Sequence, residues 1–233
     1  MKNITHLYFD LDHTLWDTDR NAEESLSELF HELELQSLGF SGFDKFHEVY
    51  KNNNEKLWGL YAENKIGKEA VRVNRFKNTF QEFGIDNDHV VNKLADQFIS
   101  ITPRKSNLID GTIELLESIK GRYHLSIITN GFKESQHTKM QASGLDKYFE
   151  HVFISEVVGI NKPDPGIFRY VMEATGAASP QNCLMIGDTY ETDIVGALNA
   201  GMRAVHLMSG TKTESSHRDV ITIHHLKELQ EIL

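Results

Sequence analysis

The feature that most constrains the fold of this chain is a short apolar segment near its amino terminus, residues 4–9, which leads directly into two aspartates. An apolar segment of this length with polar residues on both sides is typical of a buried strand. Alternate side chains share one side of an extended chain, so Asp10 and Asp12 are expected to converge on one point. Two such carboxylates repel each other unless a cation binds them or one carries a proton. The segment is also compatible with a polar strand end that has no function.

Residues 21–101 have a different character, since they contain no proline and little strand pattern. Apolar side chains recur there at the three- and four-residue spacing of amphipathic helices. Glycines separate four helical stretches, at Gly39, Gly42, Gly67 and Gly84. The first proline of the chain, Pro103, marks the end of this region. We therefore expect an inserted four-helix-bundle cap domain at residues 18–102.

Strand-like and helical segments alternate in the rest of the chain. The expected strands are 4–9, 124–129, 152–155, 183–186, 204–207 and 220–223. The expected helices are 113–120, 133–143, 165–175, a helix that follows Asp188 and ends at Ala200, and a last helix ending at 233. Such alternation predicts an α/β fold, in which helices cover both faces of a parallel sheet. This core domain would consist of residues 1–17 and 103–233.

Composition narrows the classes of function. The 233-residue chain is 39% hydrophobic and carries a formal net charge of -10, which favours a folded protein and argues against binding to nucleic-acid polymers or anionic membranes. No apolar run approaches the length of a membrane span or a signal region. The single cysteine, Cys183, excludes an internal disulfide and fits a reducing cytoplasm. We expect a cytoplasmic protein, either a monomer or a homodimer.

Polar residues fall at the carboxyl ends of three predicted strands, at Asp10, Thr129 and Asp188, and open α/β sheets bind ligands at this edge. Carboxylates from Asp10 and Asp188 suit Mg²⁺, which prefers hard oxygen ligands. The Thr129 hydroxyl and the backbone amides of Asn130 and Gly131 can hold phosphoryl oxygens. The edge is therefore a candidate site for a phosphate group and a magnesium ion.

The remaining candidates fit phosphoryl transfer. Asp10, fixed at its strand end, is the expected nucleophile, and Asp12 can protonate the leaving oxygen and later activate water. Lys162 supplies a point charge, and the proline that follows it favours an extended backbone. Each candidate also has a purely structural interpretation. These are a strand end for Thr129, a helix cap for Asp188, a first-turn acid for Asp193, a surface position for Lys162 and a turn contact for Thr14.

The motifs in chain order are Asp10-x-Asp12-x-Thr14, Thr129-Asn130-Gly131, Lys162-Pro163 and Gly187-Asp188-x4-Asp193. A chain with this series resembles the haloacid-dehalogenase (HAD) superfamily hydrolases of the branch with a helical C1-type cap inserted after the first strand of a Rossmann-like core. The resemblance implies a Mg²⁺-dependent phosphatase with an aspartyl-phosphate intermediate, and binding of the metal by the backbone carbonyl of Asp12. Halide-displacing relatives lack an aspartate at the Asp12 position. We assign Asp193 to orienting a metal-bound water or Lys162.

Within this superfamily, residues 54–58, 128–132 and 154–159 resemble the pyrimidine 5′-nucleotidase branch. Trp58 and Phe132 fall in these stretches, and flat aromatic rings suit stacking on a base. Either ring can instead be structural, Trp58 in the cap core and Phe132 as a staple for the next helix. A sugar-phosphate phosphatase similar to the N-acylneuraminate-9-phosphatase branch is the alternative, and a phosphomutase is a third. A non-turnover phosphoacceptor switch is an alternative of another class.

Overall fold

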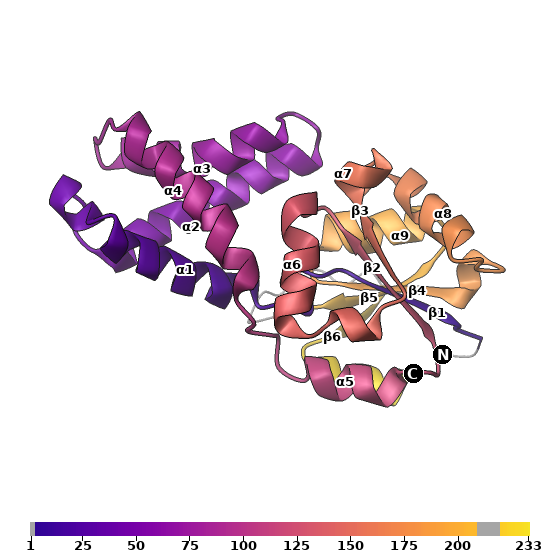
Figure 1. The fold of residues 1–233 in the computed structure, drawn as a ribbon. Helices are drawn as coiled ribbons and strands as arrows, with labels where there is room; N and C mark the ends of the chain where they lie inside the picture. Colours follow the sequence, from indigo (N-terminus) through magenta and orange to yellow (C-terminus); the bar gives the residue numbers. More distant parts are fainter. Residues whose placement is uncertain (1–2, 209–219) are drawn as a thin grey trace. The chain divides into compact units, whose positions relative to one another are not determined.

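The computed structural model describes residues 3–208 and 220–233 (Figure 1). The chain divides into two compact units. The sheet unit consists of Met1–Thr18 and Ser106–Leu233, and the helical unit is Asp19–Lys105. Within the described residues, no helix combines the length and the apolar character needed to cross a membrane.

The sheet unit is built on six parallel strands in the order β3-β2-β1-β4-β5-β6. The strands are β1 (His6–Phe9), β2 (His124–Thr129), β3 (His151–Ile154), β4 (Cys183–Gly187), β5 (Arg203–Leu207) and β6 (Ile221–Ile223). The parallel α/β fold expected from the sequence is thus confirmed. In register, Phe9 at the end of β1 pairs with Ile127 on one side and Ile186 on the other. The segments that follow β1, β2 and β4 therefore begin at one edge of the sheet.

Helices cover both faces of this sheet (Figure 1). Side chains of β1 alternate between two apolar cores, because Leu7 and Phe9 belong to one and Tyr8 to the other. The first core includes residues of α5 (Thr112–Ile119), α6 (Lys133–Ser143) and α10 (Leu226–Ile232). The second includes residues of α8 (Pro165–Ala174) and α9 (Gly196–Asn199). A strand buried on both faces explains why residues 4–9 read as an apolar run without polar alternation.

The helical unit contains α2 (Phe43–Ala62), α3 (Lys68–Glu82), α4 (Asp88–Ile101) and all of α1 (Thr18–Glu32) except its first residue. These helices correspond to the four helical stretches expected from the sequence. Two short 3₁₀-helices, η1 (Leu35–Leu38) and η2 (Thr102–Arg104), were not expected. A phenylalanine-rich core holds the unit together, with Phe30, Phe40, Phe46, Phe76 and Phe80 all buried.

Two expected elements of the sheet unit take a different form, and two short 3₁₀-helices, η3 (Asp146–Tyr148) and η4 (Pro180–Asn182), were not expected there. The strand expected at 152–155 is shifted by one residue, and Ser155 begins the short helix α7 (Ser155–Val158). The single helix expected between Asp188 and Ala200 is instead a π-helix, η5 (Tyr190–Val195), followed by α9. Apolar spacing does not distinguish a wide π turn from an α turn over so short a segment.

Candidate active site

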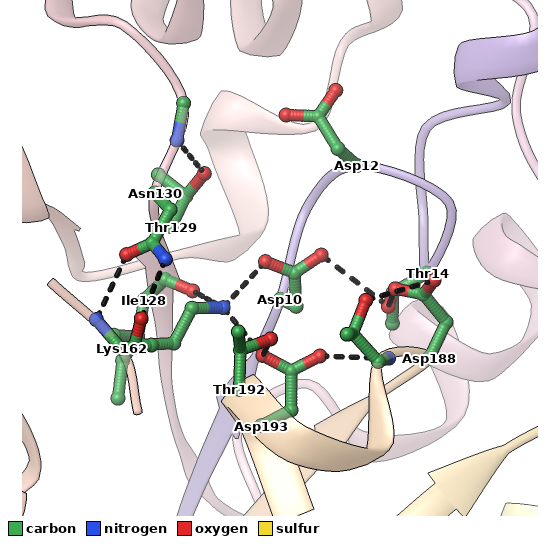
Figure 2. A network of polar contacts seen from close by, with 12 residues as sticks. Asp10, Asp12, Thr14, Ile128, Thr129, Asn130, Lys162, Asp188, Thr192 and Asp193 are labelled. Carbon is green, nitrogen blue, oxygen red and sulfur yellow. Dashed lines mark hydrogen bonds and ion pairs between the residues drawn. The ribbon is translucent and has the colours of Figure 1, made fainter. Parts of the chain in front are cut away.

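Lys162 is the centre of a buried polar network at the carboxyl edge of the sheet (Figure 2). Its ammonium nitrogen donates to Asp10 Oδ1 at 2.6 Å, to Asp193 Oδ1 at 2.7 Å and to the Ile128 carbonyl at 2.8 Å. An ammonium has three hydrogens, so all of its donors are used. Lys162 is only 2% exposed. Burial opposes the charge of Lys162, but the two carboxylates more than offset this effect and raise its pKa.

Thr14 connects the acids on the other side of this network. Its hydroxyl donates to Asp188 Oδ1 at 3.1 Å, and Asp10 Oδ2 lies at the longer distance of 3.5 Å. Asp193 is fixed further by the backbone amide of Thr189, which donates to Asp193 Oδ2 at 3.1 Å. Three separate parts of the sequence are therefore brought together, namely Asp10 with Thr14, Lys162, and Asp188 with Asp193.

The three acids form a compact cluster, in which one carboxylate oxygen each from Asp10, Asp188 and Asp193 lie within 4.8 Å of one another. Burial and the neighbouring acids raise the pKa of Asp10 well above its usual range, although Lys162 opposes this shift. Burial first, and then the charge of Asp193, raise the pKa of Asp188 to about 7. Three converging carboxylates with one ammonium have an excess of negative charge and offer hard oxygen ligands. The donor set therefore fits a divalent cation such as Mg²⁺.

The turn after β2 holds the backbone of Lys162 in place. The Asn130 side chain donates to the Lys162 carbonyl at 2.9 Å and accepts from the Lys162 backbone amide at 2.9 Å. The Gly131 amide donates to Thr129 Oγ1 at 3.0 Å. A Cβ atom at Gly131 would lie 1.9 Å from the side-chain amide nitrogen of Gln136, so a larger residue here would displace that side chain. The sequence did not indicate that Asn130 holds the backbone of Lys162.

The Asp12 carboxylate has different hydrogen-bond partners from the Asp10 carboxylate, although its charge is close enough to help raise the pKa of Asp10. The strand β1 ends at Phe9, but the Asp10 amide still donates to the Ile186 carbonyl of β4 at 2.9 Å, and Asp12 forms an isolated bridge with Trp16. Figure 2 shows the Asp12 carboxylate apart from the network around Lys162. It accepts hydrogen bonds from Thr18 Oγ1 at 3.0 Å and from the Lys139 ammonium at 2.5 Å. Burial opposes the negative charge of Asp12, but Lys139 and Thr18 hold its pKa below the usual value.

Lys139 was missed by sequence reasoning. It lies on α6, where the buried positions include Ser135, Gln136 and Lys139 as well as Met140. The available signal was that Lys139 directly precedes Met140, a core residue, on a helix face with other polar residues. Buried lysines are rare unless they are paired, so a lysine at such a position indicates an acidic partner.

The two aromatic candidates lie in different units. Phe132 is buried in the sheet unit directly before α6, whereas half-buried Trp58 lies on α2 of the helical unit, edge-on to Tyr61 with ring centroids 5.6 Å apart. Whether either ring contacts a substrate stays a prediction.

The chain thus has a parallel α/β sheet with an acid cluster and a buried lysine at its carboxyl edge. This is the edge at which open α/β proteins bind their ligands. Residues 4–201 match the family model described as haloacid dehalogenase-like hydrolase, and the chain belongs to this family. It is 30% identical to the pyrimidine 5′-nucleotidase YjjG of Escherichia coli over 97% of this chain and 96% of that protein. It is also 30% identical to the N-acylneuraminate-9-phosphatase of Mus musculus, over 88% and 82% of the two chains. The crystal structure of the HAD-hydrolase YfnB from Bacillus subtilis bound to magnesium matches with a TM-score of 0.88 and 29% identity, covering 100% of this chain and 99% of that chain.

Proposed function

We propose that this protein is a Mg²⁺-dependent phosphatase that hydrolyses small phosphomonoesters through a phosphorylated Asp10. The observation that carries this proposal is the buried contact between Asp10 and Lys162 at the end of the central strand, beside Asp188 and Asp193. A carboxylate held in this way can act as a nucleophile, and the adjacent ammonium offsets charge on the transferring group. The magnesium-bound relative supports the choice of metal.

The reaction then follows from the roles of the side chains. An oxygen of Asp10 attacks phosphorus, and the bond to the leaving oxygen breaks. Asp12, ionised beside Lys139 in the free protein, would take up a proton when the anionic phosphate binds next to it, and it gives this proton to the leaving oxygen. Water next attacks the phosphoryl group on Asp10, and Asp12 takes a proton from it, which returns both residues to their state before the first attack. Mg²⁺, held by the carboxylates of Asp10 and Asp188 and the carbonyl of Asp12, would offset negative charge. Thr129, Asn130 and Gly131 would bind phosphoryl oxygens, while Thr14 and Asp193 hold Asp188 and Lys162 in place.

For the substrate, we propose pyrimidine nucleoside 5′-monophosphates, deoxy forms included. The similarity to YjjG over almost the whole chain supports this choice. Trp58 and Phe132 are the side chains proposed to select a base, because an aromatic ring stacks on a flat base and offers little to a sugar phosphate. The equal identity to the N-acylneuraminate-9-phosphatase of mouse keeps a sugar-phosphate phosphatase as the second candidate.

A phosphate-release screen tests both levels of this proposal. The panel contains pyrimidine and purine nucleoside 5′-monophosphates, hexose and triose phosphates, N-acylneuraminate 9-phosphate and p-nitrophenyl phosphate, all with Mg²⁺. We expect multiple turnovers and the highest kcat/KM with pyrimidine nucleotides. Trp58→Ala should raise KM for nucleotides several-fold more than KM for p-nitrophenyl phosphate.

The outcomes separate the alternatives. Sugar phosphates that exceed every nucleotide would overturn the substrate proposal and leave the phosphatase mechanism in place. Equal losses on both ester types in Trp58→Ala would assign Trp58 to the core of the helical unit. Stable phosphorylation of the protein without phosphate release would indicate a phosphoacceptor switch instead of an enzyme.

A further inference from the structure

Lys139 is a buried lysine that none of the steps above uses. It lies in the middle of α6 and is 8% exposed. Its ammonium is 2.5 Å from Asp12 Oδ1 and 4.5 Å from the ring centroid of Trp16, which is itself fully buried. Burying an ammonium is costly unless it is paired, so a lysine placed at this point needs the Asp12 carboxylate and the Trp16 ring to offset the loss of water.

Both hydrogen bonds to Asp12 fall on the same oxygen. Thr18 Oγ1 and Lys139 Nζ donate to Oδ1, and Thr18 is fixed in turn because its hydroxyl accepts from the His13 amide at 3.0 Å. Among residues 3–208 and 220–233, no hydrogen-bond donor to Asp12 Oδ2 is found. One carboxylate oxygen is anchored, while the other is left for a different partner.

We propose that Lys139 is a positioning residue that anchors Asp12 by Oδ1 so that Oδ2 exchanges protons with the leaving oxygen and with water. This inference rests on the proposed function, which gives Asp12 the proton transfers. Correct placement of an acid–base group is needed because proton transfer requires hydrogen-bond distance to the reacting atom. Removing Lys139 would leave Asp12 with Thr18 alone and allow its carboxylate to rotate.

The test removes the ammonium while keeping an unbranched, apolar side chain of similar size. We expect Lys139→Met to lower kcat for a nucleoside 5′-monophosphate by about 10- to 100-fold, part of the contribution of an acid–base group, with KM changed less than about threefold. With p-nitrophenyl phosphate, whose leaving group departs without a proton, the first step should stay fast while water attack slows. A burst of nitrophenolate followed by slow turnover should then appear. Lys139→Arg, which keeps the charge and the donors, should restore part of kcat.

Two controls separate positioning from packing. Lys133→Met alters an exposed lysine on the same helix and should keep wild-type kinetics. In a double-mutant cycle with Asp12→Asn, Lys139→Met should cost nothing further, because Lys139 acts through Asp12. Thermal melts of Lys139→Met and Lys139→Gln check that both variants fold.

Several results would overturn the inference. These are wild-type kcat in folded Lys139→Met, a raised KM with unchanged kcat, no rescue by arginine, or a loss that multiplies with that of Asp12→Asn. The proposed function fails separately, through a wild-type protein that releases no phosphate or a fully active Asp12→Asn, and either result overturns the inference as well.

Discussion

Asp10 is the residue on which the proposed chemistry depends, and its surroundings predict an unusual stability effect. It shares a buried cluster with Asp188 and Asp193, and Lys162 is the neighbouring cation. Asp10→Asn removes the nucleophile, so phosphate release should fall below detection. It also removes one of three converging negative charges and leaves Lys162 paired with Asp193. Without metal, the folded variant should therefore be at least as stable as the wild type.

The matched variant for this prediction is Lys162→Met, which removes the positive charge and leaves the acids unbalanced. It should also be inactive but should unfold at lower urea concentration than the wild type, because buried charges without a partner are destabilising. Urea unfolding and phosphate release are measured on both variants. Wild-type activity in folded Asp10→Asn would contradict the covalent mechanism, and equal stability losses in both variants would contradict the charge argument.

Site residues at the ends of strands were predictable from the sequence, whereas a contact that depends on helix packing was not. Asp10, Thr129 and Asp188 were predictable because the ends of parallel strands meet at one edge, whatever lies between them in the sequence. The pairing of Lys162 with Asp193 was one of two expected possibilities, and the structure contains it. The pairing of Asp12 with Lys139 was not predictable in this way, because it depends on how α6 packs against the segment that follows β1.

The junction of β4 and η5 shows how one element positions the site. A Cβ atom at Gly187 would lie 2.3 Å from Asp193 Oδ2 and 2.5 Å from Asp193 Cβ. The last residue of β4 must therefore lack a side chain, so that η5 can bring Asp193 against the strand and toward Lys162. We expect Gly187→Ala to lower stability by about 1–3 kcal/mol, as overpacking does, and to lower kcat at least tenfold.

The same replacement at Gly59 is the control. A Cβ there meets no atom within 4 Å, and the residue lies in the last turn of α2, so Gly59→Ala should raise stability by about 0.5–1 kcal/mol. Urea unfolding and steady-state kinetics are compared for the two variants. A Gly187→Ala protein with wild-type stability and kcat would show that Asp193 can move away at no cost.

Elements were predictable from the sequence to different degrees. The helices of the helical unit extend over 14–20 residues, long enough for the apolar period to emerge, and their expected number is correct. The π-helix η5 is only six residues long, and the close approach of Asp193 to Gly187 that accompanies it has no signal in the apolar period.

At the scale of the whole molecule, the chain combines a net charge of -10 with a buried acid cluster, so folding concentrates negative charge where water cannot screen it. A divalent cation that binds only the folded protein removes this penalty. At 100 times its Kd, Mg²⁺ should stabilise the fold by about 2.7 kcal/mol. For a chain of this length, that corresponds to a rise in Tm of about 5–10 °C.

The measurement is a thermal melt in chelator and in increasing Mg²⁺, which needs no substrate and is independent of turnover. Asp188→Asn removes one of the proposed ligands and should lose most of the Mg²⁺-dependent rise, while its Tm in chelator should not fall, because one of the repelling charges is gone. Glu173→Gln removes an exposed acid on α8 of the same unit and should keep the full rise. Wild-type melts that coincide with and without Mg²⁺ would exclude the acid cluster as a magnesium site, and an equal rise in Asp188→Asn would place the ion elsewhere.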